Sequence, residues 1–514
     1  MVQFEPVHGD VDRNFEKARD LILHNEGPSP AIIVLPEMGL SGYIWSTRDE
    51  IMPHAVHCSD PATQAHWVDL AKECQSWLVI GHPAHDVVTG NLTNRCTLVS
   101  PTGVVGHYDK TCLFSEDLTW ATPGALVPPL WDTPIGIVSP LICADLDYPE
   151  PIHSAVSRGA QAIVFPTAWV GEPAPSATWM LRALEHGVPI IAADLLGEHR
   201  GRVFSGGSCV ISAEGNLLVA SDYEVGLVSA DIVVGPSSAT SEVPVTVTVH
   251  RVGTEMAEKA SSAVMVSVWP GNPAEVPPAP TVRGSHPHLV VLPTIWNSSD
   301  TWLRETQAYA ELHDALVVQG RGLSHGETAE LFVFSPEGGY FSLPSEAPEL
   351  GVALLDYCGV TVGVMRNMDL GSHHSSRALS VLGASVILSL GDHSLPSPLG
   401  HPGTLAPFAD NLGDADPSFA HPARFRAGDA NVWLGFSSET DSVPSGIFSP
   451  DHVAWPRNET LGDQSSWVSQ ECSLDELDPW GKAALRKPLV SSRGVGLYGD
   501  TFLTQVNHEQ WRTQ

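Results

Sequence analysis

The chain of 514 residues is longer than one ordinary hydrophobic core organises, and its apolar content of 43% suffices to bury two domains of roughly 250 residues each. With 26 Lys and Arg against 59 Asp and Glu, the formal net charge of −33 opposes binding to nucleic acid or to an anionic membrane surface. No apolar run approaches the roughly 20 residues that span a bilayer, and the first residues lack a signal-peptide pattern, so we expect a cytoplasmic protein.

The first half alternates helices with short strands, which is an α/β pattern. Apolar residues recur every three or four positions, which predicts amphipathic helices, in residues 11–25, 62–77 and 149–160. Runs rich in β-branched residues predict strands within residues 31–39, 76–85, 95–109, 135–147, 159–169, 188–197 and 208–221. Two of these runs contain a Gly turn between β-rich arms, so antiparallel pairs should join parallel crossovers in a mixed sheet.

The second half repeats the first in outline, after a proline-rich segment at residues 269–284 that reads as a linker or a loop excursion. Residues 289–296 echo 32–39, and the later echoes keep the same order along the chain. The period is near half the chain rather than the roughly 20 to 50 residues of a solenoid. We predict a duplicated α/β domain, with one copy in residues 1–262 and the other in residues 263–514.

Cysteine and histidine usage argues against a metal or cofactor. The 8 cysteines lack paired Cys-x-x-Cys spacing, which is typical neither of a disulfide framework nor of a zinc ribbon. His373 and His374, with His393 and His401 further on, are irregularly spaced among Ser, Gly and Pro, which favours ordinary loop histidines. We expect no metal and no cofactor.

Cys143 lies at a predicted junction between a strand and a helix. The backbone N–H of Ala144 can there point at a developing oxyanion. A thiol attacks as thiolate and needs a base and a positive charge, and Glu37 and Lys110 also follow predicted strand ends. The alternative from the residues alone is a buried cysteine acting as a small hydrophobe and a solvated lysine.

Five segments, in order, resemble those of amidohydrolases of the nitrilase superfamily: LPEMGLSGY, HYDKTCLF with TPG, LICADLDYPE, RGAQAIVFPTAW and RALEHGVPIIAADLLG. The resemblance covers roughly residues 1–235 and implies an αββα sandwich. It also implies that Glu37, Lys110 and Cys143 form the Glu–Lys–Cys triad of that family. Cys143 is followed by Ala-Asp rather than Trp-Glu, which resembles amidases and carbamoyl hydrolases more than nitrilases proper.

The resemblance leaves the accessory residues open. The family often uses a second Glu about seven residues after the Lys, and here that register falls on Asp117, beside Glu116, so both stay candidates. Trp120 and Trp169 are candidate walls of the substrate pocket, although aromatic residues at strand ends more often serve packing. Asp194 stands where relatives commonly carry Asn.

Four further positions match the family, and we interpret them as structural ion pairs and caps: Asp145, Glu150, Arg182 and Glu185.

The second half lacks the nucleophile. Overlaying the two halves on their shared Gly-Ala places Asn367 at the Cys143 position and Asp369 at the Asp145 position. Thr294 falls at the Glu37 position and Ser345 at the Lys110 position. We therefore predict a degenerate, non-catalytic domain that replaces the second subunit of homodimeric relatives, giving an intrachain pseudo-dimer. A homo-oligomer is the alternative.

The sequence thus predicts hydrolysis of a non-peptide carbon–nitrogen bond, with a small-molecule amide as substrate and a thioester on Cys143 as intermediate. Three alternatives use the same triad: nitrile hydrolysis, N-carbamoyl hydrolysis and acyl transfer. An alternative of another class is a pseudoenzyme that binds an amide ligand or acts as a scaffold.

Overall fold

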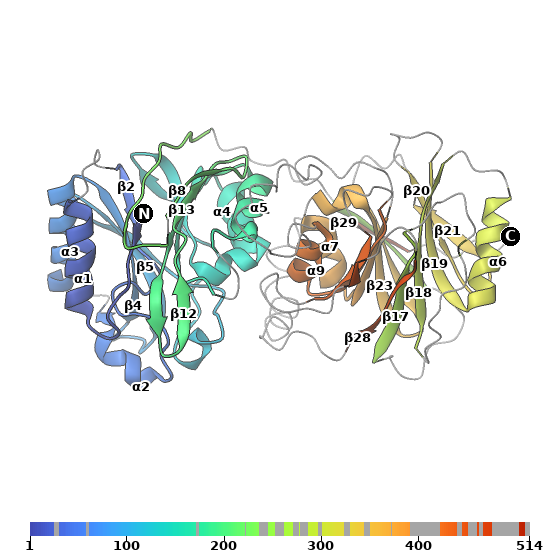
Figure 1. Cartoon of the computed structure of the whole chain (residues 1–514), viewed down its shortest axis with the longest axis horizontal. Coiled ribbons are helices and arrows are strands. Elements are labelled where there is room, and N and C mark those ends of the chain that lie inside the picture. Colours follow the sequence, from blue (N-terminus) through green and yellow to red (C-terminus); the bar gives the residue numbers. More distant parts are fainter. Residues whose placement is uncertain are drawn as a thin grey trace. The chain divides into compact units, whose positions relative to one another are not determined.

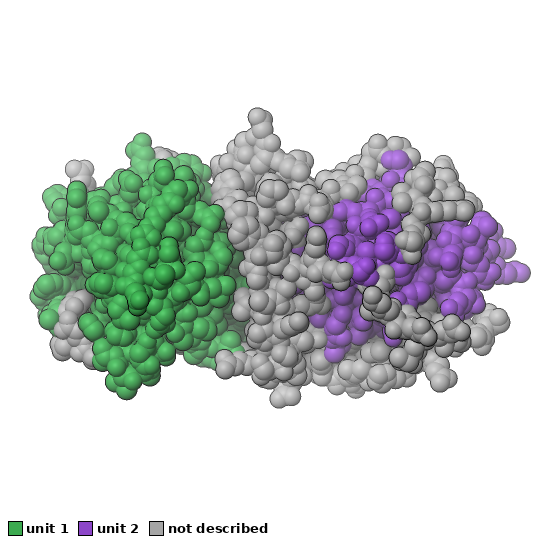
Figure 2. Space-filling model, turned by 90° about the horizontal axis from the view of Figure 1, so that it is seen from below, with its two compact units in different colours: residues 1–241 green, residues 242–514 purple. Residues whose placement is uncertain are grey.

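The computed structural model describes most of the first half of the chain and separate stretches of the second (Figure 1). The described residues are 1–24, 30–57, 61–170, 174–221, 223–235, 245–251, 262–270, 277, 286–296, 301–322, 329–343, 350–371, 373–390, 422–438, 445–450, 460–461, 466–474 and 503–508. They form two compact units, Met1–Ser241 and Glu242–Gln514, which are coloured separately in Figure 2. Ser345, His393, His401 and most of segment 269–284 lie outside the described residues.

One sheet of the first unit has the strand order β2-β4-β5-β6, with β3 beside β4. Its strands are β2 (Ile32–Val34), β3 (Val56–His57), β4 (Trp77–His85), β5 (Leu92–Ser100) and β6 (Gly103–Asp109). β2 and β4 are parallel, whereas β4, β5 and β6 are successively antiparallel, as expected for a mixed sheet.

Helices α1 (Val11–Leu23) and α3 (Pro61–Cys74) cover the outer face of this sheet (Figure 1). The side chain of Asp10 caps α1 by accepting from the backbone N–H of Arg13. The buried residues of α1 recur every fourth position, at Asn14, Ala18 and Ile22, and so form one helix face. Both helices confirm the helices predicted from apolar periodicity in residues 11–25 and 62–77.

The other sheet of the first unit has the order β14-β13-β10-β9-β8-β7. Its strands are β7 (Trp131–Thr133), β8 (Gly136–Pro140), β9 (Ala162–Thr167), β10 (Ile190–Asp194), β13 (Cys209–Ile211) and β14 (Leu217–Ala220). The central strands β8, β9 and β10 are parallel. Helices α4 (Pro149–Ser157) and α5 (Ala177–His186) cover its outer face, which confirms the αββα layering predicted for the first half (Figure 1).

Short elements complete the first unit. They are β1 (Val2–Gln3) paired with β15 (Gly226–Leu227), the hairpin β11 (Leu196–His199) and β12 (Arg202–Ser205), α2 (Arg48–Ile51), and the 3₁₀ turns η1 (Met52–His54), η2 (Asp117–Thr119) and η3 (Cys143–Asp147).

The carboxyl ends of the parallel strands carry the candidate residues. Glu37 follows β2, Cys143 follows β8, and Asp194 is the last residue of β10. The two sheets face each other, with β2 and β4 against β9 and β10. These strand ends therefore meet at one edge of the sandwich, as ligand sites of α/β folds do.

The second unit is also a mixed α/β unit with two sheets, of orders β27-β26-β25-β24-β23-β22-β16-β29 and β21-β20-β19-β18-β17-β28. The strands of the larger sheet are β16 (Val245–Arg251), β22 (Leu350–Tyr357), β23 (Val360–Arg366), β24 (Val386–Leu390), β25 (Trp433–Phe436), β26 (Gly446–Phe448), β27 (Thr460–Leu461) and β29 (Leu503–His508). Those of the smaller sheet are β17 (Ala263–Val268), β18 (His288–Trp296), β19 (Ala315–Gly322), β20 (Glu330–Phe334), β21 (Tyr340–Leu343) and β28 (Val468–Ser473).

Apolar side chains from both sheets of this unit pack together as one core. Helices α7 (His373–Val381) and α9 (Pro422–Ala430) pack on the far face of the larger sheet, and α6 (Trp302–His313) packs on the far face of the smaller one (Figure 1). The 3₁₀ turn η4 (Asn367–Gly371) follows β23, as η3 follows β8 in the first unit. The order β27 to β22 also matches the order β14 to β7 strand for strand.

The second unit begins earlier than the boundary expected at residue 262. β16 lies before that boundary, yet it pairs in parallel with β22 and with β29 of the second unit. Within the described part of the chain, no helix combines the length and the apolar character needed to cross a bilayer.

Candidate active site

Lys110 lies at the centre of a buried ionic cluster. Its Nζ donates to Glu37 Oε1 and to Asp117 Oδ2, each at 2.7 Å, and all three side chains are fully buried. An ammonium group carries three N–H donors, so two are engaged by carboxylates. The third stays available for a substrate oxygen.

The two neighbouring acidic candidates have different surroundings. Asp117 is fully buried and also accepts from the Tyr43 hydroxyl at 3.0 Å. Glu116 instead forms an ion pair with Arg202 and accepts from the Ser115 hydroxyl. The structure therefore brings Asp117, and not Glu116, to Lys110.

Asn94 was not predicted from the sequence, although it joins both carboxylates. Its Nδ2 donates to Glu37 Oε1 at 2.7 Å and to Asp117 Oδ1 at 3.2 Å. One sequence signal was available, because Asn94 precedes the apolar same-face positions Cys96 and Leu98 in a strand that is buried throughout. A polar residue on such a face needs a partner.

The Cys143 turn is held in an uncommon backbone conformation. Cys143 has φ +46°, in the left-handed region that favours glycine, at a cost of about 1–3 kcal/mol. Asp145 braces this turn, since its Oδ2 accepts from the Ile142 N–H and from the Tyr108 hydroxyl, both at 2.9 Å. Its Oδ1 accepts from the Cys112 N–H at 2.8 Å. Asp145 thereby ties the Cys143 turn to the loop that carries Lys110, which supports a structural role.

The backbone of Ala168 connects Cys143 with Glu37. Its N–H donates to Glu37 Oε2 at 2.9 Å, and its carbonyl oxygen accepts from Cys143 Sγ at 3.8 Å. Glu37 Oε1 is occupied by Lys110 and Asn94, whereas Oε2 has this one partner. Among the described residues, Oε2 is thus the less engaged of the two Glu37 oxygens, and it shares the Ala168 backbone with the Cys143 thiol.

Burial and charge set the protonation states of the cluster. Burial and then the Glu37 carboxylate hold the pKa of Cys143 well above its usual range, against the opposing charge of Lys110. Burial lowers the pKa of Lys110, but the Asp117 and Glu37 carboxylates outweigh it, and the pKa is raised well above its usual range. Burial also raises the pKa of Glu37, against Lys110. A neutral thiol therefore rests beside a fixed cation and a carboxyl group able to take its proton.

The three predicted substrate contacts are all buried in the first unit. Ala144 follows Cys143 within η3, where N–H groups of a first turn have no partner inside the helix. Trp120 packs in an apolar cluster with Met38 and Tyr43. Trp169 packs edge to face against Trp179, with ring centroids 5.3 Å apart.

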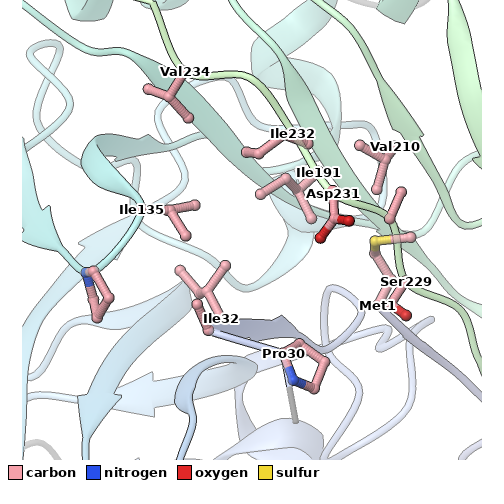
Figure 3. Close-up of a pocket in the computed structure, with 13 residues that line it drawn as sticks. Met1, Pro30, Ile32, Ile135, Ile191, Val210, Ser229, Asp231, Ile232 and Val234 are labelled. Atoms are coloured by element: carbon pink, nitrogen blue, oxygen red, sulfur yellow. The ribbon is translucent and has the colours of Figure 1, made fainter. Parts of the chain in front are cut away.

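A pocket of about 570 Å³ lies at the opposite strand ends of the first unit (Figure 3). Ile32 from the start of β2, Ile191 from the start of β10 and Ile135 before β8 line it, with the Asp231 carboxylate at one side. Within the described residues, none of the candidate site residues lines this pocket. It is separate from the Cys143 cluster.

Comparison with known proteins places relatives over the first unit. A sequence model described as carbon-nitrogen hydrolase matches residues 1–240. A nitrilase from Pyrococcus abyssi is 32% identical over 234 residues, covering 45% of this chain and 88% of the relative. A 2-oxoglutaramate amidase from Bacillus subtilis is 24% identical over 259 residues, covering 45% and 88%. The solved structure of an amidase from Nesterenkonia sp. is 24% identical, covers 44% of this chain and 86% of its own, and has a TM-score of 0.39.

Proposed function

Because the chain belongs to the carbon–nitrogen hydrolase family through residues 1–240, we propose that it is an amidase that hydrolyses a small-molecule amide with Cys143 as nucleophile. The observation that carries the proposal is a single buried cluster. In it, Lys110 bonds Glu37, and the backbone of Ala168 joins Glu37 to the Cys143 thiol.

In the first step, Glu37 Oε2 takes the thiol proton and the sulfur of Cys143 attacks the amide carbon. The carbonyl oxygen becomes an oxyanion, which the remaining N–H of Lys110 and the backbone N–H of Ala144 stabilise. The carbon–nitrogen bond then breaks, and the leaving nitrogen takes the proton from Glu37. Ammonia or an amine departs and a thioester remains on Cys143.

In the second step, Glu37 takes a proton from water, and the resulting hydroxide attacks the thioester carbon. The new oxyanion uses the same two donors. Its collapse expels the sulfur, which regains its proton from Glu37, and the carboxylic acid product leaves. Asp117 and Asn94 act in neither step directly, but they hold Lys110 and Glu37 in place.

An amide is proposed over a nitrile because Ala144 and Asp145 follow the nucleophile, as in the amidase and carbamoyl-hydrolase pattern. The relatives include a nitrilase as well as amidases. Nitrile hydrolysis, N-carbamoyl hydrolysis and acyl transfer use the same thioester or its equivalent, so they become outcomes of the test below.

The second unit is proposed to be a degenerate, non-catalytic copy of the first. Its support is the matching strand order, together with Asn367 in place of the thiol. Asn367 Nδ2 donates to the Ser437 carbonyl at 2.8 Å and its Oδ1 accepts from the Ser389 hydroxyl at 2.8 Å. An amide side chain cannot perform thiolate chemistry.

We further propose that this copy serves the chain as the second subunit serves homodimeric relatives. Sedimentation then gives a species of one chain mass, 54.9 kDa. A stable dimer or a larger assembly would contradict the pseudo-dimer while leaving the amidase proposal intact.

Mass spectrometry of the intact chain tests the activity. The protein is incubated with panels of amides, nitriles and N-carbamoyl compounds, with and without hydroxylamine as an acyl acceptor. We expect an acyl adduct and ammonia with amides, and neither in Cys143→Ala. Cys358→Ser is the matched control, because Cys358 is an exposed thiol of the second unit and its loss should leave the adduct unchanged. No adduct and no ammonia across the panel would favour a binding pseudoenzyme.

A further inference from the structure

Asp194 is a buried carboxyl group with one unused oxygen. Its Oδ1 accepts from the backbone N–H groups of Trp169 and Leu195, both at 2.9 Å. Its Oδ2 has no hydrogen-bond partner among the described residues, although the side chain is fully buried. A polar oxygen in this position needs an explanation.

Ionised Asp194 would be a buried anion without a cation. The Glu37 carboxyl, on the loop after β2, acts on Asp194, and Asp194 in turn raises the pKa of the Cys209 thiol, on β13. Burial strongly disfavours an unpaired charge, and the neutral acid avoids this penalty. Burial and then Glu37 hold the pKa of Asp194 well above its usual range, although two backbone N–H bonds favour the carboxylate.

One peptide group links Asp194 to the nucleophile. The carbonyl oxygen of Ala168 and the N–H of Trp169 belong to the same planar peptide unit. The N–H is bonded to Asp194 Oδ1, and the carbonyl accepts from Cys143 Sγ. The adjoining N–H of Ala168 bonds Glu37. This peptide therefore contacts the thiol directly, and the peptide before it contacts the base.

We propose that Asp194 is a positioning residue of the Cys143 site, which acts in its protonated form and holds the Ala168–Trp169 peptide against the thiol, next to the Ala168 N–H that bonds Glu37. The inference rests on the proposed function only in taking Cys143 as the nucleophile. Neutrality is part of the role, because a negative charge in addition to that of Asp117 would disfavour ionisation of Glu37, which must be ionised to accept the thiol proton.

The first experiment measures alkylation of Cys143 by iodoacetamide as a function of pH, with peptide mass spectrometry as readout. Asp194→Asn keeps the acceptor oxygen and is always neutral, so its pH profile should overlay that of the wild type. Asp194→Ala removes the acceptor from both N–H groups and should slow alkylation by roughly 100-fold, the scale of a small misplacement of reacting groups. An unchanged rate in Asp194→Ala would overturn the positioning role.

The sign of any shift in Asp194→Asn is informative. If Asp194 were ionised in the wild type, the substitution would remove a negative charge beside Glu37 and lower the pKa of Glu37. The acidic limb of the alkylation profile would then move to lower pH, which would overturn the protonated form.

Infrared difference spectroscopy gives an independent readout that needs neither substrate nor alkylation. The spectrum of wild type minus Asp194→Asn at neutral pH should contain the carbonyl band of a protonated carboxylic acid. Carboxylate bands in its place would contradict the proposal. Failure of the amidase proposal would appear as absent turnover and would leave this band unaffected, so the two failures are distinguishable.

Discussion

The two units keep the same anchor beneath the turn and differ at the reactive position. In the first unit, Asp145 Oδ2 accepts from the N–H of Ile142 at 2.9 Å. In the second, Asp369 Oδ2 accepts from the N–H of Arg366 at 3.0 Å. In both cases the bond closes the 3₁₀ turn that follows a strand, although the two turns present different side chains.

A buried arginine also makes equivalent contacts in the two units. Arg182 Nε donates to the carbonyl of Leu146 at 3.1 Å, and Arg426 Nε donates to the carbonyl of Leu370 at 2.8 Å. Each guanidinium also pairs with a carboxylate three residues later on its own helix, at 3.0 and 2.9 Å. The contacts that fasten the turn to the helix are retained in both units.

The reactive groups are not retained. Thr294 lies against Gly320, because a Cβ added to Gly320 would lie 2.5 Å from the Thr294 hydroxyl. Glu37 lies against Gly81 in the same way, because a Cβ added to Gly81 would lie 2.9 Å from the Cα of Glu37. The second unit thus has a hydroxyl group at the position where the first has a carboxyl group. Under the proposed duplication, the chemistry can be lost while the turn is kept, because the anchoring residue and the reactive residue are separate.

The largest expected effect concerns the nucleophile position. Cys143→Ala should lower turnover by at least about 10⁴-fold, because removal of a nucleophile leaves only binding and oxyanion contacts. Asn367→Cys placed in the Cys143→Ala background should restore nothing, since the second unit has Thr294 in place of a base. Steady-state ammonia release measures both. Recovered turnover in the double variant would contradict the proposal that only the first unit can be catalytic.

Loss of the buried arginine should destabilise the two units by similar amounts. Arg182→Met and Arg426→Met each remove one partner of a buried ion pair, so each should lower the free energy of unfolding by about 3–5 kcal/mol. Urea unfolding followed by tryptophan fluorescence measures the change. Arg200→Met, which breaks a largely exposed pair with Glu50, is the control and should cost less than about 1 kcal/mol. A large loss of stability in only one of the two arginine variants would show that the equivalent contacts do not stabilise the two units equally.

Acid should weaken each unit in part through a histidine whose pKa is lowered by burial. Burial lowers the pKa of His82 in β4 and of His288 in β18 from 6.5 to about 4. Between these pH values the unfolded histidine binds a proton that the folded one does not, so stability falls as the pH drops from 6.5 to 4. For His82 the loss is roughly 3 kcal/mol.

His82→Gln should remove the part of the acid-induced loss of stability that His82 causes in the first unit. His288→Gln should remove the corresponding part in the second unit. Urea unfolding at several pH values, read as the difference from the wild type, measures each share. An unchanged slope in either variant would show that the histidine in question is not the group that titrates.

Helices α1, α3 and α4, most strands of the first unit and the positions of Glu37, Lys110 and Cys143 after strand ends were predicted from the sequence, because apolar periodicity and local motifs report on neighbours in the chain. Helix α5 was not among the predicted helices. The choice between Glu116 and Asp117 was not predicted either, since it depends on which way one short turn presents its side chains. Tyr43 and Asn94 escaped prediction because their partner Asp117 is distant in sequence. The unpartnered oxygen of Asp194 is visible only once the packing is known.

The smallest expected effect separates the two acidic neighbours of the first unit. Glu116→Gln removes a partly exposed ion pair with Arg202 and should change turnover by less than about threefold. Asp117→Asn removes a charge that Lys110 contacts at 2.7 Å and should lower turnover by at least about tenfold. Comparable losses of turnover in the two variants would mean that the Arg202–Glu116 ion pair also shapes the site. The chemistry missing from the second unit would then extend beyond the buried cluster.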